Sequence, residues 1–594
     1  MAPSLHKIIV GLDYGTTYTG VSYVTSNEES MEKIEVISQW PGTSDTASKV
    51  PTRIAYASEN NNLMTDSWGF TVAASMESYS WTKLLLDRTS TLTDFDDPSL
   101  RNLMGFGMMR LPVDKSAKEV CEDFLTGLHH YTAMILAKKY SPEIYDITPV
   151  ECWITVPAIW SDAAKNATRS AAMMAGFGSR PNDAVNIITE PEAAALAALK
   201  PHVDPRSIDP VHPGENILVC DCGGGTVDIT TYKIMEASPR LLFKELCVGI
   251  GGKVGSTYID RNFNKWLSDT FGEAYTRIPA KKRGPGSAFM RSFETAKRAF
   301  GSNLDGRNEM KFIEIEHLYM KCSWSSSFDE DENTLKLTSA DMQSFFDPVV
   351  SDVLRLITSQ ADRAKSLGHP VDRVILVGGF GDSDYLVGRI RSWCEAQTVR
   401  AKLTCPPQCQ AAIVRGAALR GLEGLKPSSR ISRRHYGHPV GLRFRDGRDP
   451  EQHAYHNHWH DKKYCSSRVD WGVRKGQEIN DDFEVELEVG RNYYNTDLRY
   501  VNKAFHVKLL CCSSDDAPEQ EFEAGVEKVG TISTEFSDLD FASAPKRFKQ
   551  GIGWIHRLEY VIKIRFSAEE GVLVFSTWIE GRQAGHTKVE FHDT

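Results

Sequence analysis

Apolar residues in the first part of the chain occur in short runs that end in polar residues and glycine. The stretches Ile8 to Val24 and Ile217 to Ile234 follow one plan: an apolar run, an aspartate, a glycine-containing turn, a threonine and a second strand-like run. Each stretch predicts a β-hairpin. The two aspartates, Asp13 and Asp221, lie too far apart for a solenoid repeat, so the shared plan predicts a duplicated lobe.

Strand-like and helix-like stretches alternate after the first hairpin. Val150 to Trp160 predicts a strand, and Ser161 predicts the N-cap of an alanine-rich helix that ends at Gly176. Val371 to Leu386 predicts a further strand that ends in a glycine pair. The alternation predicts an α/β architecture.

Two further helices contain unusually small residues. One is expected to begin at Pro191, with Glu190 at its N-terminus, and the other covers Cys409 to Leu422. Small side chains let a helix approach another backbone closely. We therefore expect the helix after Glu190 to lie close to another backbone.

The pattern changes after residue 425. Residues 426–438 carry proline, serines and arginines without apolar periodicity, which predicts a linker. Beyond Pro439 the pattern becomes β-like, with clear alternation in the last two strands and a turn at 568–571. One face of the first of these strands is expected to carry Tyr560, Ile562, Ile564 and Phe566, and one face of the next is expected to carry Leu573, Phe575 and Thr577.

These patterns predict three parts of the chain. Residues 1–425 form an α/β unit, in which lobe I covers about 1–215 and lobe II about 216–400 before the chain returns to lobe I. The linker 426–438 follows. Residues 439–594 form a β-rich domain of ordinary size.

Composition limits the partners. The 594 residues carry 79 acidic and 69 basic side chains, a formal net charge of −10, which favours solubility over binding to nucleic acid. We find no signal-peptide core and no run long enough to span a membrane, so we expect no membrane partner and a cytoplasmic location, with the nucleus as the alternative. Acidic stretches at 327–333 and 513–523 are interpreted as solvated loops.

Cysteine and histidine patterns bear on metal binding. The twelve cysteines are sparse and are interpreted as reduced thiols. Cys220 with Cys222, and Cys405 with Cys409, each lack a second pair at zinc-site spacing. Four histidines in the stretch His453–His460 could collect a metal, since a strand would place the last three on one face, and a merely polar loop is the alternative.

The aspartate–glycine turns suggest a chemistry. Glycine lets backbone amides come within hydrogen-bonding distance of a bulky anion, and successive amides in a turn form a concave anion site. One hairpin from each lobe would hold a polyphosphate from two sides. Asp13 and Asp221 would face the same phosphates, which is tolerable only if a cation such as Mg²⁺, held partly through water, lies between them. For one such turn alone, an ordinary tight turn is the alternative.

Five motifs occur between residue 7 and about residue 422. In chain order they are VGLDYGTTYTGV, ITVPA, TEPEAAA, VCDCGGGTVDIT and VGGFGDSDYL. They resemble the phosphate, connecting and adenosine motifs of the actin-like ATPases, and within these of the seventy-kilodalton heat-shock chaperones. The divergent member-twelve branch is the one resembled, since the chain ends without a helical lid. The resemblance implies duplicated ribonuclease-H-like lobes followed by a β-sandwich-like, peptide-binding domain.

The resemblance also implies roles for single residues. The two hairpin aspartates match the ligands of Mg²⁺ and its water, Lys83 matches the lysine that contacts the γ-phosphate and water, and Glu190 matches the acid beside the metal. Thr226 and Asp228 match positions around the attacking water and a monovalent cation, K⁺. The phosphate hairpins are matched by Gly15, Thr16, Thr17, Tyr18, Gly223, Gly224, Gly225 and Thr226.

The segment FETAKRAF would supply the adenosine side. Glu294, Lys297 and Arg298 share one helical face. By itself this pattern indicates a solvated amphipathic helix with a local ion pair, whereas the resemblance implies contacts with adenine and ribose. The other side of the adenosine would be closed by Gly378, Gly379, Phe380 and Asp382.

The resemblance implies an ATP- and ADP-binding, slowly hydrolysing, chaperone-like protein whose nucleotide state regulates a polypeptide-binding C-terminal domain. Positioning and charge neutralisation would supply most of the acceleration. A nucleotide-gated scaffold or sensor with little hydrolysis and a small-molecule kinase of the same superfamily are the alternatives. The client and any co-chaperone or exchange factor are not identified by the sequence.

Two features depart from the family pattern. Gln410 and Ala411 stand where the family usually has an acid, which affects one contact between the lobes. The linker lacks the short acidic-leucine segment that couples the domains of typical members, so interdomain signalling is expected to differ. A P-loop is excluded, because Lys253 is followed by valine and Cys247 replaces the first glycine.

Overall fold

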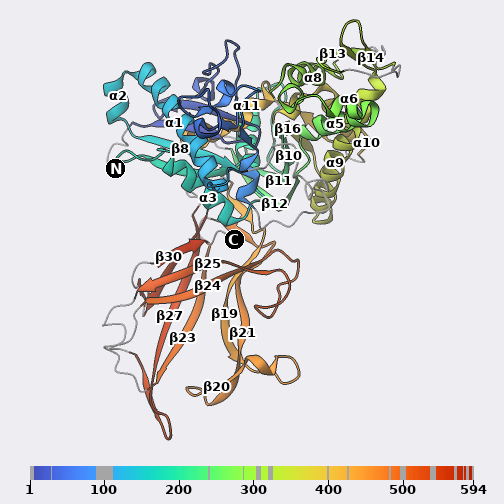
Figure 1. Cartoon of the computed structure of the whole chain (residues 1–594). Coiled ribbons are helices and arrows are strands. Elements are labelled where there is room, and N and C mark those ends of the chain that lie inside the picture. The colour runs from blue at the N-terminus through green and yellow to red at the C-terminus, as the bar shows by residue number, and fades with distance from the viewer. Residues whose placement is uncertain are drawn as a thin grey trace. The chain divides into compact units, whose positions relative to one another are not determined.

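The computed structural model describes residues 6–28, 30–87, 111–237, 241–284, 286–302, 310–318, 326–397, 400–424, 427–480, 483–494, 504–535, 544–567, 572–579, 581–583 and 587–591. The chain divides into two compact units, Met1–Pro427 and Ser428–Thr594 (Figure 1). The first unit is α/β, and the second is built almost entirely from strands.

The first unit contains two mixed sheets that share one strand order. The first runs β3-β2-β1-β8-β9, with β4 beside β2, and the strands of this unit in the second run β12-β11-β10-β16-β17. In each sheet an antiparallel hairpin, β1-β2 or β10-β11, lies beside two parallel strands, so both predicted hairpins are confirmed. The bounds are β1 Ile8–Asp13, β2 Tyr18–Thr25, β3 Glu35–Val36, β4 Val50–Pro51, β8 Val150–Val156, β9 Ala184–Thr189, β10 Asn216–Cys222, β11 Val227–Glu236, β12 Leu242–Gly252, β16 Arg373–Val377 and β17 Lys402–Thr404.

Helices accompany both sheets, and their ends follow the local signals in the sequence. The Ser161 side chain accepts a hydrogen bond from the backbone N–H of Ala164 at 3.2 Å, which caps α3 as predicted. Pro191 lies in the first turn of α4, also as predicted. The helices are α1 Ala117–Tyr140, α2 Pro142–Ile147, α3 Asp162–Met174, α4 Glu190–Leu199, α5 Thr257–Phe271, α6 Glu273–Thr276, α7 Ala280–Arg283, α8 Ala288–Ala299, α9 Ser339–Ser366, α10 Asp384–Ala396 and α11 Cys409–Glu423.

Two smaller sheets and two short 3-10 helices complete the part of the first unit that matters for the site. The 3-10 helices are η4 Thr82–Leu86, which contains Lys83, and η7 Phe380–Asp382, which contains two of the predicted adenosine residues. The strands of the smaller sheets are β5 Arg53–Ala55, β6 Ser67–Trp68, β7 Tyr79–Ser80, β13 Lys311–Glu314, β14 Phe328–Asp329 and β15 Thr334–Leu337.

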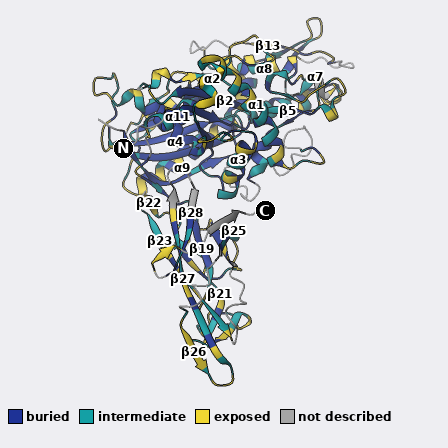
Figure 2. Ribbon diagram, turned by 90° about the vertical axis from the view of Figure 1, so that its left-hand side faces the viewer, coloured by how far each residue is buried: buried dark blue, intermediate teal, exposed yellow. Residues whose placement is uncertain are grey.

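The central strands β1 and β10 are buried on both faces (Figure 2). In β1, Leu12 packs with residues of α1 and α3, whereas Ile9 packs with α4 and α11. The helices α4 and α11 share this last core with residues of β10 and β16, so they lie between the two sheets. A Cβ at Gly416 would come within 1.8 Å of the Ala193 carbonyl oxygen, which is why this helix contact requires small residues.

The second unit contains two antiparallel sheets with a main apolar core and a smaller apolar cluster, and the strand pair β18-β22. The orders of the two sheets are β20-β21-β19-β24-β25-β30 and β23-β27-β28-β29, with β26 paired to β27. Tyr560, Ile562 and Ile564 lie in the main core with Phe575, as predicted, while the predicted turn 568–571 and the side chains of Phe566 and Leu573 lie outside the described residues. The strands are β18 Ser429–Ile431, β19 His435–Arg443, β20 Ala454–Asn457, β21 Lys462–Val473, β22 Glu478–Asn480, β23 Glu484–Tyr494, β24 Ala504–Cys512, β25 Val526–Glu535, β26 Lys546–Lys549, β27 Gly553–Ser567, β28 Val572–Ile579, β29 Arg582–Gln583 and β30 Thr587–Phe591.

The prediction of a linker at 426–438 is wrong. Two strands, β18 and β19, begin inside it, because Ser429, Ile431 and His435 are buried by strand pairing that composition does not reveal. In the acidic stretch 327–333, the short strand β14 pairs with β15, and residues 330–333 form an exposed turn, which agrees with a solvated loop.

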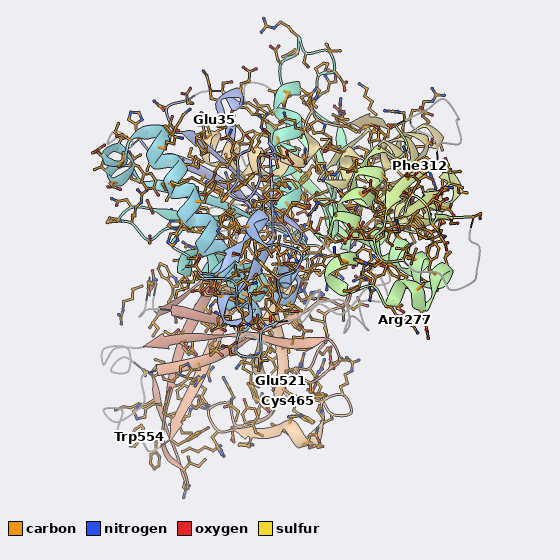
Figure 3. All side chains as sticks on the ribbon, turned by 45° about the horizontal axis from the view of Figure 1, so that its top comes forward. Glu35, Arg277, Phe312, Cys465, Glu521 and Trp554 are labelled. Carbon is orange, nitrogen blue, oxygen red and sulfur yellow. The ribbon has the colours of Figure 1, made fainter. Side chains whose placement is uncertain are left out.

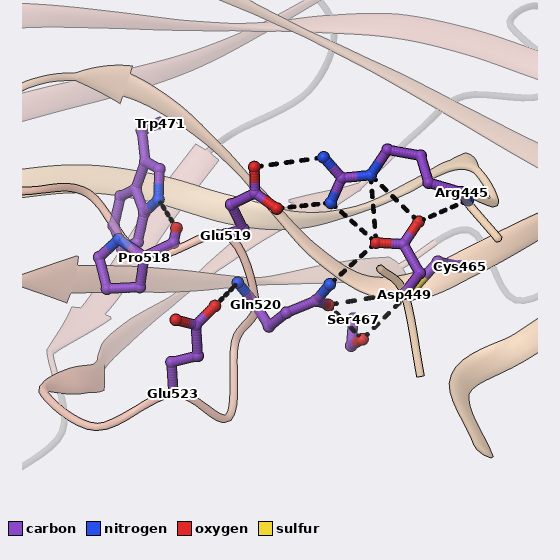
Figure 4. Close-up of polar contacts among 9 residues, drawn as sticks. All are labelled: Arg445, Asp449, Cys465, Ser467, Trp471, Pro518, Glu519, Gln520 and Glu523. Atoms are coloured by element: carbon purple, nitrogen blue, oxygen red, sulfur yellow. Dashed lines mark hydrogen bonds and ion pairs between the residues drawn. The ribbon is translucent and has the colours of Figure 1, made fainter. Parts of the chain in front are cut away.

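The acidic stretch 513–523 is largely exposed, but one residue in it is anchored in the interior (Figure 4). Gln520 is buried; its amide donates to Asp449 Oδ1 at 3.1 Å and accepts from the Ser467 hydroxyl at 2.7 Å. Arg445 binds both Asp449 and Glu519. This network ties the loop to β21 and to the segment after β19, since each buried polar atom in it requires a partner.

Candidate functional site

The turns of the hairpins β1-β2 and β10-β11 lie directly against each other. A Cβ at Gly224 would lie 2.2 Å from Thr17 Oγ1, and one at Gly225 would lie 2.9 Å from Thr16 Cγ2. Only glycine can occupy these two positions without moving the opposite turn. The structure thus brings together the two turns, 15–18 and 223–226, that lie about two hundred residues apart in the sequence.

Neighbouring segments hold the backbone of both turns. The N–H of Thr257, at the start of α5, donates to the Gly224 carbonyl at 3.0 Å, and its hydroxyl donates to the same oxygen at 2.7 Å. On the other side, the Thr52 hydroxyl donates to the Gly15 carbonyl and its N–H donates to the Thr17 carbonyl, both at 2.8 Å. The turns are therefore positioned before any ligand binds.

Four carboxyl groups gather beside the turns. Asp13 accepts hydrogen bonds from Thr155 Oγ1 at 3.0 Å and from Lys49 Nζ at 2.6 Å. Asp221 and Asp228 are directly opposite each other in the register of β10 and β11. The fourth carboxyl group, Glu190, begins α4 and is buried.

Two lysines, the buried Lys83 and the partly buried Lys49, face this acidic cluster. Lys83, in η4, donates to Glu190 Oε1 at 2.8 Å, and its ammonium lies 5.2 Å from the centre of the Trp160 ring. Lys49 pairs with Asp13 and interacts electrostatically with Asp221 and Glu190. The sequence-predicted Lys83 and Glu190 therefore form one pair, and Lys49 adds a cation that no motif had indicated.

The pKa values report a site that carries more negative than positive charge. Burial, together with repulsion from Glu190, Asp228 and Asp13, raises the pKa of Asp221 well above its ordinary value. Burial and repulsion from Asp13 likewise raise the pKa of Glu190, against the attraction of Lys83. For Lys49, burial lowers the pKa, but attraction by the carboxylates outweighs it and the pKa is raised.

Asp221 Oδ1 is buried and has no hydrogen-bond partner among the residues that the structure describes. A buried carboxylate oxygen without a partner is costly, so this atom suits a cation or a water bound to one. The possible metal ligands nearby are carboxylate oxygens, the ligand type that Mg²⁺ prefers. Among the described residues, no group of three or more histidine, cysteine, aspartate or glutamate side chains is arranged to hold a metal by itself. Mg²⁺ usually keeps several waters and binds through one or two carboxylates and substrate phosphates, so Asp13 and Asp221 fit it.

The predicted adenosine residues also converge. Lys297 lies 2.8 Å from Asp260 Oδ1 and 2.6 Å from Glu294 Oε2, and Arg298 Nε donates to Glu294 Oε1 at 2.7 Å. Tyr18, from the first turn, interacts electrostatically with Glu294, Lys297 and Arg298. The face of α8 therefore lies close to the first turn.

The loop after β16 completes this side. Asp382 interacts with Arg298, and Gly378, with φ of 88°, approaches Asp221 so closely that a Cβ would lie 2.4 Å from its Oδ1. Gly379 is exposed, and a Cβ there would meet nothing within 4 Å. The Phe380 side chain is only 4 % exposed and packs against Phe346 in the core, so only its backbone lies beside the site.

Three residues of the site were missed by sequence reasoning. Lys49, Thr155 and Asp260 each contact a predicted residue, yet none of them belongs to a predicted site position. Lys49 and Asp260 carry no local signal at all, because a charged residue beside a short strand or on a helix is usually solvated. Only their long-range contacts reveal them.

The stretch His453–His460 does not lie on one strand face, the arrangement that metal binding by its histidines would have used. The strand β20 ends at Asn457, so His458 and His460 lie in the turn that follows. The rings of His456 and His458 are 4.9 Å apart, His456 Nε2 lies 2.9 Å from Asp461, and His460 stacks on Tyr464. Among the described residues, these histidines do not form a group of three that could hold a metal.

Comparison with known proteins gives two matching family models. The model described as Hsp70 protein matches residues 9–383, and a domain of unknown function (DUF8568) matches residues 430–541. Human heat shock 70 kDa protein 12B is 24% identical over 90% of this chain and 84% of its own length. Mouse heat shock 70 kDa protein 12A is 26% identical over 75% of this chain and 74% of its length. The chaperone protein DnaK of Thermoplasma volcanium is 29% identical over 49% of this chain and 43% of its length.

Proposed function

The chain belongs to the Hsp70 family, whose model matches residues 9–383, and from this premise we propose that it binds ATP and hydrolyses it slowly, with the nucleotide state regulating polypeptide binding by the β-rich unit. The observation that carries the proposal is the pair of abutting glycine turns beside a buried acidic cluster that is short of positive charge. A polyphosphate with its cation is the ligand that such a pair of turns suits.

In this proposal the backbone amides of the turns 15–18 and 223–226 hold the phosphates, and Lys83, oriented by Glu190, offsets the charge that develops on the γ-phosphate. Asp228 and Thr226 position the attacking water. Mg²⁺, bound by Asp13 and Asp221 largely through water, would neutralise phosphate charge; K⁺ beside Thr226 and Asp228 is the further expected ion.

The adenosine would lie between the α8 face and the loop after β16. Glu294, Lys297 and Arg298 present donors and acceptors for ribose and base, and Asp382 approaches from the loop. We also infer that the two sheets of the first unit are copies of one lobe, which their shared strand order supports. The cysteines of the described residues are mostly buried thiols outside any disulfide, which suits the reducing cytoplasm, the location we propose.

For the second unit we propose binding of an extended polypeptide by its antiparallel sheets, through main-chain pairing and side-chain pockets. The alternative is that this unit acts as a packing module. Titration of a fluorescent unfolded peptide into the full chain, with ADP and with ATP, separates the two. A nucleotide-dependent affinity supports the proposal, and no peptide binding in either state contradicts it.

The site assignment is tested by replacing Asp221 with asparagine. Turnover of ATP to ADP and phosphate is expected to fall at least about a hundredfold, since Asp221 would help to hold the Mg²⁺ that neutralises the phosphate charge. Asp269→Asn, in an exposed helix pair with Lys265, is the control and should keep wild-type turnover. Unchanged turnover in Asp221→Asn would refute the assignment. Wild-type binding of ATP without turnover would favour the scaffold, and transfer of the γ-phosphate to a sugar would favour the kinase.

A further inference from the structure

The hairpin of β26 and β27 at one end of the second unit presents two large aromatic side chains to solvent. Phe548 and Trp554 are opposite each other in its register and are 61% and 48% exposed. Trp554 is seen at the periphery of the structure (Figure 3), and exposed residues follow β26 (Figure 2). Large exposed aromatic side chains that adjoin each other mark an interaction surface more often than scattered single ones do.

These side chains share one face of the hairpin with a cation. The rings of Phe548 and Trp554 are T-shaped, with centroids 5.5 Å apart, and Lys546 Nζ lies 5.2 Å from the Trp554 ring. Lys546 is itself exposed and is two residues from Phe548 along the strand. We call this set, Lys546, Phe548 and Trp554, the aromatic face.

The opposite face of the hairpin is anchored. Arg547 donates to the Trp459 carbonyl at 2.7 Å and lies 5.6 Å from the centre of its ring, and Lys549 forms an ion pair with Asp461. Ile555, opposite Arg547 in the register, is fully buried. The contacts of the opposite face therefore fix the orientation of the hairpin, and the side chains of the aromatic face are left exposed.

The hairpin carries positive charge, although the chain as a whole carries −10. The segment 546–558 contains Lys546, Arg547, Lys549 and Arg557 and no acidic residue. Lys546 lies on the aromatic face, whereas Arg547 and Lys549 lie on the opposite face, and Asp461 and Glu559 pair with Lys549 and Arg557. The aromatic face thus combines two projecting rings with one cation, on a hairpin whose bases outnumber the acids paired with them.

We propose that the aromatic face docks on the surface of an anionic lipid membrane. Tryptophan and phenylalanine partition to the level of the headgroups, and lysine and arginine are attracted to negatively charged lipids. A projecting convex hairpin suits a flat bilayer surface better than an extended peptide, which requires a groove or a free sheet edge. Stacking of nucleic-acid bases is disfavoured, because Lys546 and Phe548 already occupy the face and surroundings of the Trp554 ring.

This docking is peripheral. No helix of the described part of the chain is long and apolar enough to cross a membrane. The sequence-based expectation of no membrane partner rested on that same lack of an apolar span, and it gave no indication of a surface assembled from two strands. The proposal is independent of the ATPase assignment.

The test measures flotation of the full chain with vesicles of phosphatidylcholine alone and of phosphatidylcholine with phosphatidylserine. Binding is expected only with phosphatidylserine, and the double variant Phe548→Ser/Trp554→Ser is expected to bind at least about tenfold more weakly. Lys546→Glu should also weaken binding, most strongly at low salt. Phe312→Ser is the matched control, because Phe312 is a 60% exposed phenylalanine in the first unit, and it should bind like the wild type.

A second measurement does not depend on the double variant folding. Vesicles that contain brominated lipid should quench the tryptophan fluorescence of the wild type more than that of Trp554→Phe, which conserves an aromatic ring. Equal quenching, equal binding by all variants, or no preference for phosphatidylserine would each overturn the proposal. Binding of single-stranded RNA or an acidic peptide that depends on the aromatic face, without vesicle binding, would also overturn it.

Discussion

Lys49 balances charge at the centre of the acidic cluster. Its ammonium lies 2.6 Å from Asp13, and both side chains are largely buried. Removing one partner of a buried ion pair leaves the other charge uncompensated, so Lys49→Met is expected to lower the free energy of unfolding by about 3 kcal/mol. Urea denaturation of the ligand-free chain measures this effect.

A control for this prediction is Lys265→Met, which removes an exposed helix pair with Asp269 and should change stability little. Mg²⁺ should restore part of the stability of Lys49→Met, because Asp13 is then open to another cation. Equal effects of the two substitutions would show that Lys49 does not serve this role.

Asp260 introduces a pH dependence on the adenosine side. Burial, together with repulsion from Glu294, outweighs the attraction of Lys297 and raises the pKa of Asp260 from 3.8 to about 6. The folded chain therefore holds a proton that the unfolded chain releases between pH about 4 and 6. The contribution of this group to stability is present below that interval and is lost as the pH rises through it.

Asp260→Asn is thus expected to gain stability relative to the wild type as the pH is raised from about 4 to 7. Melting temperatures of the two proteins at each pH give the difference. A difference that stays constant, or that shrinks with rising pH, would contradict the assignment of the raised pKa to Asp260.

At the scale of elements, the contact between α4 and α11 is the tightest helix packing described. Gly416→Ala would place a methyl group 1.8 Å from the Ala193 carbonyl oxygen, and backbone cannot yield as a flexible side chain can. We expect a loss of about 2 to 3 kcal/mol in the free energy of unfolding, the cost typical of an overpacked core. Chemical denaturation monitored by circular dichroism tests this.

Gly388→Ala is the matched control in another helix. It lies inside α10, and a Cβ there meets nothing within 4 Å. Alanine loses less conformational entropy than glycine on folding, so this variant should be more stable than the wild type by up to about 1 kcal/mol. A similar loss in both variants would indicate a general intolerance of glycine substitution, unrelated to the helix contact.

At the scale of the whole molecule, all the proposed nucleotide contacts lie in the first unit. Hydrogen exchange of the full chain, with and without ADP and Mg²⁺, is expected to slow in β1-β2, β10-β11 and α8, because binding stabilises the folded state against opening. The proposed regulation adds a second expectation, a change of exchange within residues 428–594. A change confined to the first unit would contradict regulation and leave nucleotide binding intact.

The sequence by itself determined the features that depend on neighbouring residues. Glycine turns, the Ser161 cap, Pro191 in the first turn of α4 and the alternation in β27 are local signals, and each was found where it was predicted. The order of the five motifs likewise indicated the family, which the family model confirms. Local backbone preferences and periodicity depend on only a few neighbouring residues, so they can be identified in the sequence without the fold.

Only the tertiary structure decided the features that depend on distant residues. In the folded chain Lys49 contacts Asp13, and Asp260 contacts Lys297. The Phe380 side chain is buried in the core, and strands begin within the predicted linker. The strand β20 ends before two of the four histidines. The aromatic face likewise arises where two strands pair. The energy of such contacts comes from burial and charge pairing between segments far apart in the chain, which no short stretch of sequence encodes.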